Sequence, residues 1–195
     1  MNLISTISRD LECKARWRYG KQGYAAMLKV AVADGTAAMI VYRLMQWSRR
    51  WRLIPLELLF NKLNAVFCNC IIGRGAEFGP GFVMLHSTGT VIHGRVRGGE
   101  EVYLEHQVTM GGERHGAPAL GNNVYVGAGA KIIGPVLIGE GARIGANAVV
   151  VNDVPAFTTV VGIPAKVVRR RIPEPAINGV RHNEMNSDSL VQDDA

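Results

Sequence analysis

The sequence predicts an all-β solenoid that is preceded by an α-helical segment. An apolar residue returns at every sixth position through the middle of the 195-residue chain, and Gly often follows it. A helix repeats its buried face about every 3.6 residues and a strand about every 2, so neither has this period. Short strands that are joined by tight turns and stacked in coils do have it. The apolar positions are Ile72, Phe78, Met84, Val96, Val102, Val108, Leu120, Val126, Ile132, Ile138, Ile144 and Val150.

The repeat is interrupted at two positions. Its phase slips at Thr90 and at Arg114, and it is in phase again at Leu120. We therefore interpret residues 111–119 as a loop that leaves an otherwise continuous coil, where functional side chains do not disturb the stack. The solenoid as a whole is predicted over residues 70–168.

Residues 1–69 have a different pattern, which predicts a helical cap. Apolar and cationic residues are mixed at helical spacing from Met39 to Trp51, and a second helical stretch runs from Leu56 to Phe67. Pro55 lies between the two stretches and marks a boundary. A solenoid needs such a cap because its open end otherwise exposes the core.

The same helices allow a second interpretation, in which they form a basic amphipathic surface that lies on a membrane. Residues 25–42 are the most apolar stretch, but Lys29 and Asp34 interrupt it, which argues against a spanning helix. In this interpretation the residues at the interface and toward anionic headgroups are Trp47, Trp51, Arg43, Arg49, Arg50 and Arg52.

The composition indicates a globular protein, with 48% hydrophobic residues and a formal net charge of +6. The positive charge suits an anionic cofactor, and since no nucleic-acid-binding motif accompanies it, we expect no nucleic-acid partner. Residues 1–12 lack the apolar core of an export signal, so we expect a cytoplasmic protein, with the inner face of the membrane as an alternative site. Residues 169–195 are basic, then polar, and are expected to form a disordered tail.

The repeat resembles that of the hexapeptide-repeat acyltransferases, in which an aliphatic residue and Gly are followed by four variable positions. Ile138–Arg143 and Ile144–Val149 are clear examples. The resemblance implies a left-handed parallel β-helix, which is a three-sided prism with three hexapeptides in each coil. It also implies a homotrimer in which each active site lies between subunits.

Within the repeat, Leu85–Gly89 resembles the Asp-His-Ala-Thr-Gly segment of the serine acetyltransferases, whose histidine is the catalytic base. A neutral imidazole can take the proton of a hydroxyl that attacks a thioester. We therefore predict that His86 is the general base. His115, in the loop, matches the second active-site histidine of that family. His106 lies about one coil beyond Thr88; it either assists in the same groove or only decorates a prism face.

The resemblance implies that the donor is acetyl-CoA, held in a groove between two subunits. Ala128, Ala146, Lys166 and Arg169 match positions that contact the cofactor in related sugar acetyltransferases. Small residues let the pantetheine arm approach backbone amides, and cations near the end of the coil attract the phosphates of CoA. The alternative for the two cations is a solvated basic terminus.

Two departures from the serine acetyltransferases bear on the acceptor. Ile71 stands where that family has the aspartate that orients the catalytic histidine, and Leu85 stands where it has an aspartate expected to help hold the ammonium group of serine. Glu105, Glu113 or a backbone carbonyl would then have to orient His86. The loss of both carboxylates weakens the case for an amino-acid acceptor.

Short chains with a histidine-rich coil and a basic N-terminal helix also resemble the acetyltransferases of surface-polysaccharide assembly, of the colanic acid type. We therefore predict an acetyl-CoA-dependent O-acetyltransferase whose acceptor is a sugar hydroxyl of a surface-polysaccharide precursor. The alternative is a serine O-acetyltransferase of cysteine biosynthesis, with L-serine as acceptor. The chain ends in Ala195, whereas members that dock onto cysteine synthase end in isoleucine, so no such docking is expected.

Two other kinds of protein are weighed against this prediction. The γ-type carbonic anhydrases share the prism and hold a metal with paired histidines five positions apart, a spacing that this sequence lacks, so no metal is expected. A non-enzymatic scaffold would keep the repeat, but it would not need His86, the loop and Gly162–Lys166 together. His93 and His182 are assigned no catalytic role.

Overall fold

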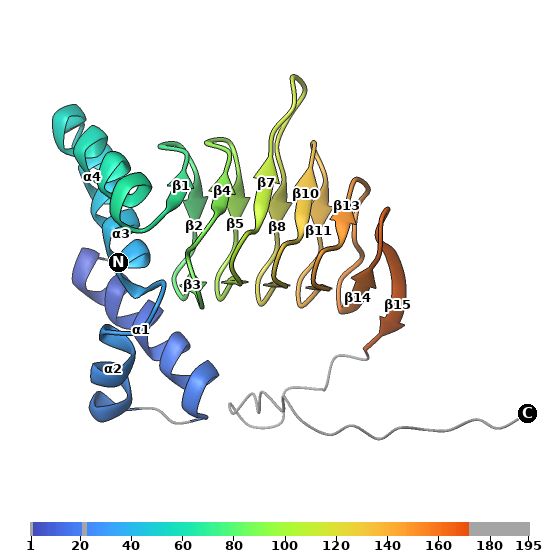
Figure 1. The fold of residues 1–195 in the computed structure, drawn as a ribbon, viewed down its shortest axis with the longest axis horizontal. Coiled ribbons are helices and arrows are strands. Elements are labelled where there is room, and N and C mark those ends of the chain that lie inside the picture. The colour runs from blue at the N-terminus through green and yellow to red at the C-terminus, as the bar shows by residue number, and fades with distance from the viewer. Residues whose placement is uncertain (1, 21–22, 172–195) are drawn as a thin grey trace, which may run out of the picture.

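The computed structural model describes residues 2–20 and 23–171, in which four helices precede a coil of short strands (Figure 1). The helices are α1 (Leu3–Tyr19), α2 (Tyr24–Ala31), α3 (Thr36–Arg50) and α4 (Ile54–Phe67). The strands are β1 (Cys70–Ile72), β2 (Glu77–Phe78), β3 (Val83–Met84), β4 (Thr90–Ile92), β5 (Arg97–Gly98), β6 (Tyr103–Leu104), β7 (Thr109–Gly111), β8 (Ala119–Leu120), β9 (Tyr125–Val126), β10 (Lys131–Ile133), β11 (Leu137–Ile138), β12 (Arg143–Ile144), β13 (Val149–Val150), β14 (Thr158–Val161) and β15 (Lys166–Arg170). The expected tail begins inside β15, and its residues 172–195, with His182 and Ala195, lie outside the described residues.

The strands described here form three sheets, which are the faces of a prism (Figure 1). The first sheet has the order β1-β4-β7-β10-β13, the second β11-β8-β5-β2 and the third β15-β14-β12-β9-β6-β3. Successive coils pair in parallel, and among the named strands of the described residues only β15 pairs antiparallel, with β14. The predicted fold is confirmed: a left-handed parallel β-helix with an N-terminal helical segment.

The apolar repeat fills the interior of the prism. All twelve positions of the predicted repeat are buried. At one level the second sheet brings Gly98 into register with Phe78, and a Cβ atom on Gly98 would clash with the Phe78 ring. The absence of a side chain at Gly98 therefore leaves room for the aromatic ring. Burial of each aliphatic side chain contributes roughly 1.5–3 kcal/mol to the stability of the stack.

The structure corrects the phase of the repeat between β4 and β7. Ile92 is in register with Ile72 and with Met110, and Met110 is in register with Ile132. These coils are therefore 20, 18 and 22 residues long. Two additional residues before β4 and four additional residues after β7 together equal one hexapeptide, which is why the phase was regained at Leu120.

The shifted phase changes which residues occupy the centres of the strands. Val96, Val102 and Val108 are buried, but each precedes the strand-centre position by two residues. The strand-centre positions in this stretch are Gly98, Leu104 and Met110. The strand-centre positions and the positions two residues before them both face the interior of the prism, because each earlier position is buried in the turn that precedes the strand.

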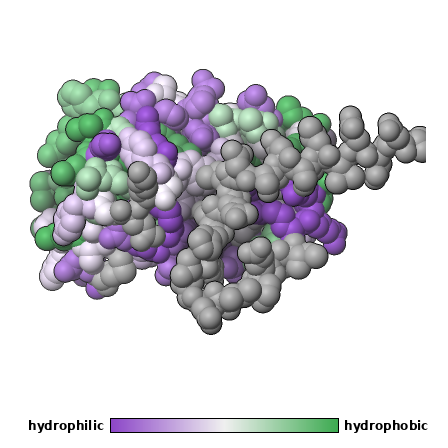
Figure 2. Space-filling model, turned by 90° about the horizontal axis from the view of Figure 1, so that it is seen from below, coloured by the Kyte–Doolittle hydropathy of each residue, from purple (hydrophilic) through white to green (hydrophobic). Residues whose placement is uncertain are grey.

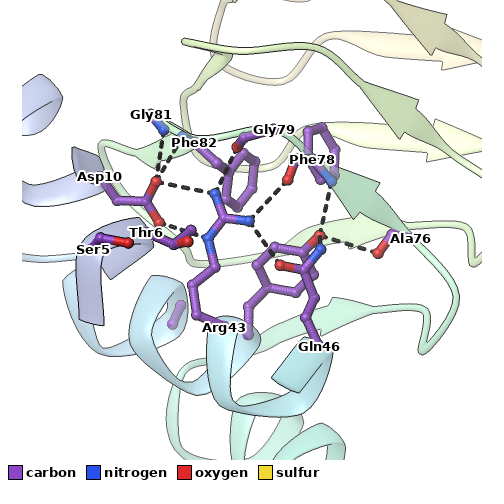
Figure 3. A network of polar contacts seen from close by, with 12 residues as sticks. Ser5, Thr6, Asp10, Arg43, Gln46, Ala76, Phe78, Gly79, Gly81 and Phe82 are labelled. Carbon is purple, nitrogen blue, oxygen red and sulfur yellow. Dashed lines mark hydrogen bonds and ion pairs between the residues drawn. The ribbon is translucent and has the colours of Figure 1, made fainter. Parts of the chain in front are cut away.

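A buried ion pair between Asp10 of α1 and Arg43 of α3 joins the cap to the first coil (Figure 3). Nε of Arg43 donates to Oδ2 of Asp10 at 2.7 Å. Oδ1 of Asp10 accepts from the backbone N–H groups of Gly81 at 2.8 Å and Phe82 at 3.0 Å, and Arg43 donates to the carbonyl of Phe78 at 2.8 Å. Burial raises the pKa of Asp10, while Arg43 and the two N–H groups oppose that rise. These directional contacts fix how the cap sits on the coil.

A second buried carboxylate, Glu57 of α4, is held by two arginines. Arg49 donates to it at 3.1 Å and Arg74 at 3.0 Å. Burial by itself would raise the pKa of Glu57, but the hydrogen bonds from Arg74 and Arg49 outweigh it and lower the pKa. The membrane interpretation assigned Arg43 and Arg49 to lipid headgroups. For Arg43 this assignment is wrong, because Arg43 is buried and pairs with Asp10, whereas Arg49 pairs with Glu57 at a half-exposed position.

Helix α3 is a core helix of the cap. Its buried side chains, among them Tyr42 and Met45, belong to the same cluster as the interior of the prism. Over the residues that the structure describes, no single helix is long and apolar enough to cross a membrane. Helices α2 and α3 reach that length and composition only as a pair, and the pair is bent by 92°.

Candidate active site

The turns that follow β3, β6, β9 and β12 stack on one another and form one edge of the prism, which we call the histidine edge. His86, His106, Ala128 and Ala146 lie along this edge in that order. Strands of neighbouring coils are about 4.8 Å apart, so the four positions span about 14 Å. The backbone hydrogen bonds that stack the turns run from Gln107 to Thr88 (2.9 Å), from Gly129 to His106 (2.9 Å) and from Asn147 to Ala128 (2.8 Å).

His86, the predicted general base, lies on the first turn of the histidine edge. Its Nδ1 is 3.3 Å from Oδ2 of Asp34. The His86 side chain is 46% exposed, so a substrate can reach the ring. A carboxylate beside Nδ1 favours the tautomer with its proton on Nδ1 and leaves Nε2 as the proton acceptor. Asp34 thus takes the orienting position that we expected of Glu105, Glu113 or a backbone carbonyl.

Asp34 comes from the cap, in the turn between α2 and α3. The next residue, Gly35, has a φ of 75°, a conformation that favours glycine, and a Cβ atom there would clash with the carbonyl oxygen of Met84. Lys14 of α1 is fully buried and donates from Nζ to the carbonyl of Asp34 and, at 2.7 Å, to that of Met84. Lys14 therefore ties the Asp34 turn to the strand that leads to His86.

His106 lies on the next turn of the edge. Its ring centroid is 6.0 Å from that of His86, and the two rings are nearly perpendicular. Nδ1 of His106 is 3.9 Å from Glu105, which also accepts from the hydroxyl of Tyr125 at 3.3 Å. Burial and the neighbouring Glu105 raise the pKa of Tyr125 to about 12, so this hydroxyl stays protonated. The structure brings His86 and His106 together, and the catalytic role of His106 stays a prediction.

His115 lies away from the other two histidines of its own chain. It is exposed at the tip of a hairpin loop, where Glu113 and Gly116 pair through their backbones. The loop follows β7 and projects from the edge between the first and second sheets (Figure 1). His86 and His106 lie on the edge between the third and first sheets, so one chain alone does not unite the three predicted histidines.

The residues predicted to contact the donor follow the histidine edge toward the C-terminal end of the coil. Ala128 and Ala146 lie on the edge itself, and the turn 162–165 continues it beside β13. Lys166 and Arg169 are exposed on β15, beyond that turn. The edge therefore leads from two imidazoles past two small residues to exposed cations. The contact of these four residues with CoA stays a prediction.

The thiol and acidic side chains offer no second reactive centre. Within residues 2–20 and 23–171, no group of three or more His, Cys, Asp or Glu side chains could hold a metal ion. Burial raises the pKa of Cys13 to about 11 and that of Cys70 to about 12. Both thiols therefore stay protonated at neutral pH and are poor nucleophiles.

Sequence reasoning missed the parts of the site that the cap supplies. In the sequence Asp34 appears only as a break in an apolar stretch, and no pattern marks Lys14. An Asp-Gly pair between two apolar runs is a turn signal that could have marked Asp34. His93, which was assigned no catalytic role, lies under the base of the loop, because a Cβ atom on Gly112 would clash with its ring.

Comparisons with known proteins agree with this fold. Residues 118–152 match the family described as "Bacterial transferase hexapeptide (six repeats)". The chain is 36% identical over 167 residues to a serine acetyltransferase of Synechococcus elongatus, which covers 83% of this chain and 65% of that relative. It is 37% identical over 142 residues to a serine acetyltransferase of Helicobacter pylori, which covers 70% of this chain and 82% of the relative.

Solved structures give the same result. The crystal structure of serine acetyltransferase from Vibrio cholerae matches with a TM-score of 0.79 and 30% identity, over 87% of this chain and 67% of that one. A serine acetyltransferase in complex with CoA matches with a TM-score of 0.77 and 30% identity, over 85% of this chain and 69% of that one. Another, in complex with cysteine, matches with a TM-score of 0.77 and 29% identity, over 86% and 70%.

These relatives overturn the predicted acceptor. We expected a sugar hydroxyl of a surface-polysaccharide precursor, but the similar proteins are serine acetyltransferases. The expectation rested on the missing carboxylates at Ile71 and Leu85, and the structure shows that Asp34 of the cap brings a carboxylate to His86 instead. The chain therefore belongs to the serine acetyltransferase family of hexapeptide-repeat transferases.

Proposed function

We propose that this chain is an acetyl-CoA-dependent L-serine O-acetyltransferase. The observation that carries the proposal is the pairing of an exposed His86 with Asp34 at the start of the histidine edge. A base of this kind suits the removal of a hydroxyl proton at neutral pH. The carboxylate also gives the site a negative charge, which suits an acceptor that carries an ammonium group. The names of the relatives support serine as that acceptor.

The reaction follows from the tautomer that Asp34 favours. Nε2 of His86 accepts the proton of the serine hydroxyl as the hydroxyl oxygen attacks the thioester carbonyl carbon of acetyl-CoA. The tetrahedral intermediate then collapses, the carbon–sulfur bond breaks, and the proton passes from Nε2 to the departing thiolate. The products are O-acetylserine and CoA, and no acyl-enzyme forms. Asp34 stabilises the imidazolium that exists between the two proton transfers.

The donor is proposed to lie along the histidine edge. Its thioester would be at His86, its pantetheine arm beside Ala128 and Ala146, and its phosphates near Lys166 and Arg169. Small side chains permit close approach to the backbone, and two exposed cations at the far end attract phosphate. The complex of a relative with CoA supports this choice of donor.

A homotrimer would complete the site. His115 projects from a different edge of the prism than His86, so a neighbouring subunit is needed to bring a loop of this kind to the histidine edge. Parallel prisms in a closed ring place one edge of each subunit beside another edge of the next. We include the loop of the neighbouring subunit, with its His115, in the proposed site.

The test is the release of free CoA thiol from acetyl-CoA by the purified protein, with and without L-serine. We expect serine-dependent release, and His86→Ala should lower kcat by about 100-fold or more while the circular dichroism spectrum and CoA binding are retained. Glu77→Gln, which changes an exposed carboxylate on another face, should leave turnover unchanged. The base assignment is wrong if His86→Ala keeps wild-type turnover, and the proposed function is wrong if serine elicits no release.

A further inference from the structure

Helix α4 is amphipathic, but it turns polar side chains toward the protein and apolar side chains toward solvent. Among the side chains that it turns toward the protein, Glu57, Asn61 and Asn64 are polar and lie one turn apart on a single face, and Phe60 packs against the core. Asn61 donates to the carbonyl of Ile72 at 2.8 Å, and Asn64 donates to that of Ala38 at 3.3 Å. Polar contacts thus join the helix to the rest of the cap and to the first coil, beside the apolar contact of Phe60.

The opposite face of α4 is apolar and open to solvent. Val66 is 72% exposed and Phe67 78% exposed, and Leu59 on the preceding turns is 50% exposed. Figure 2, seen from the side opposite to that on which α4 lies in Figure 1, shows that hydrophobic side chains also gather there at the helical end of the molecule. A surface helix of a folded protein normally turns its apolar stripe inward. Exposed apolar patches of this kind mark sites of interaction.

The charged residues that α3, α4 and the turn between them expose are all positive. Glu57 is the only acidic residue between positions 36 and 67, and it is buried. Arg50, Arg52 and Lys62 are exposed and make no ion pair among the described residues, and the exposed indole of Trp51 lies beside them in the chain. An apolar helix face, a Trp and unpaired cations together form the pattern of a helix that lies in a membrane interface.

We propose that the outer face of α4 rests on an anionic lipid surface. The apolar side chains would enter the boundary between headgroups and acyl chains, and the cations would contact lipid phosphates. A second copy related by a two-fold axis is a poorer occupant, because such a contact would place Lys62 and the arginines against their own copies. Helix α4 packs against α3 and β1. Its C-terminal end adjoins the first turn of the histidine edge, where the carbonyl of Cys68 accepts from the hydroxyl of Ser87 at 3.0 Å.

Co-sedimentation of the full chain with vesicles tests the proposal. We expect binding to phosphatidylcholine vesicles that contain phosphatidylglycerol, no binding to phosphatidylcholine alone, and weaker binding as salt rises. Arg52→Gln and Lys62→Gln should each weaken binding to the anionic vesicles about fivefold. The pair Leu59→Ser and Val66→Ser should weaken it about tenfold or more.

Matched controls come from the coil. Leu137 is 60% exposed, and Leu137→Ser with Val151→Ser removes comparable apolar surface from another part of the molecule. Arg97→Gln removes an exposed cation there. The proposal fails if the wild-type chain ignores anionic vesicles, or if the α4 variants bind as the coil variants do. It also fails if Leu59→Ser with Val66→Ser leaves vesicle binding intact and lowers the oligomeric mass in light scattering, since a second copy would then cover the face.

Discussion

The interior of the coil and its junction with the cap bury different kinds of side chain. The interior of the coil is a column of aliphatic residues, with polar groups turned outward. The junction between cap and coil contains the buried charges Asp10, Arg43, Lys14 and Glu57, while α4 turns its apolar face outward. Apolar burial is additive and has no direction, so it can repeat from coil to coil. Buried hydrogen-bonded charges have strict geometry, so they hold one arrangement of two different parts.

This difference explains where the site lies. The coil alone can place His86, His106 and the small residues of the histidine edge, because each follows from the repeat. It cannot supply the carboxylate at His86, which comes from a turn of the cap. A site that needs one side chain from each part requires a junction that does not slide, and Lys14 and the Asp10–Arg43 pair provide it.

Among the changes that test the difference between coil and junction, Arg43→Met should have the largest effect on stability. The replacement leaves Asp10 buried without its cation and leaves the carbonyl of Phe78 without a donor. We expect a loss of about 3–5 kcal/mol in the free energy of unfolding, measured by urea denaturation. Adding Asp10→Leu to the same chain should restore part of that loss. If Arg43→Met alone is neutral, the junction does not depend on buried charge.

A deletion inside the coil should cost slightly less. Ile132→Ala removes most of a fully buried side chain at the centre of β10 and should lower the free energy of unfolding by about 3 kcal/mol. Turnover per folded molecule should be retained, because the deletion lies inside the prism and touches no side chain of the histidine edge. Ile71→Ala, at an exposed position of β1, should change stability by less than about 0.5 kcal/mol. Equal losses at the two positions would contradict the described interior.

Lys14→Met tests whether the junction positions the site. It removes the two hydrogen bonds that Nζ of Lys14 donates to the carbonyls of Asp34 and Met84, so Asp34 should no longer be held at His86. A small displacement of a positioned group can cost about 100-fold in rate, and we expect kcat with L-serine to fall about 10- to 100-fold. The KM for acetyl-CoA should be unchanged, since its proposed contacts lie elsewhere on the edge. A purely structural role would lower stability and leave kcat per folded molecule intact.

The protonation of Lys14 predicts a smaller effect of pH on stability. Burial lowers the pKa of Lys14 from 10.5 to about 8. Below that value Lys14 is protonated in both the folded and the unfolded chain. Between about pH 8 and 10.5 only the unfolded chain keeps the proton, so stability should rise with pH. Relative to Lys14→Met, the free energy of unfolding should rise by about 1 kcal/mol from pH 8 to 9, and a flat difference would exclude this titration.

The smallest effect should be found on the outer face of α4. Leu59→Ser exchanges an exposed apolar side chain and should change the free energy of unfolding by less than about 0.5 kcal/mol. Asn61→Ala, on the inner face, leaves the carbonyl of Ile72 without its donor and should cost about 1 kcal/mol or more. If urea denaturation shows a larger loss in the free energy of unfolding for Leu59→Ser than for Asn61→Ala, then α4 does not bury its polar face as described.

The sequence was sufficient for the coil because each coil repeats the same local rule. Twelve interior residues from Ile72 to Val150 could be predicted from their spacing, but Ile92, Leu104 and Met110, which are also buried, were not among them. The phase between Ile92 and Met110 could not be predicted, because two insertions that together equal one repeat leave no trace in the spacing on either side. Asp34 was missed for a different reason: it meets His86 across 52 positions of the chain, and only the packing of α1 and α3 on the coil brings them together.

The loop after β7 shows what a solenoid permits. Its four additional residues lengthen one coil, yet the coils on both sides pair in register, because each coil touches only its neighbours. A loop at such a corner can be lengthened, shortened or replaced without disturbing the coils from which it projects. Proteins of this fold can therefore acquire different chemistry through changes in the sequence of a single corner loop.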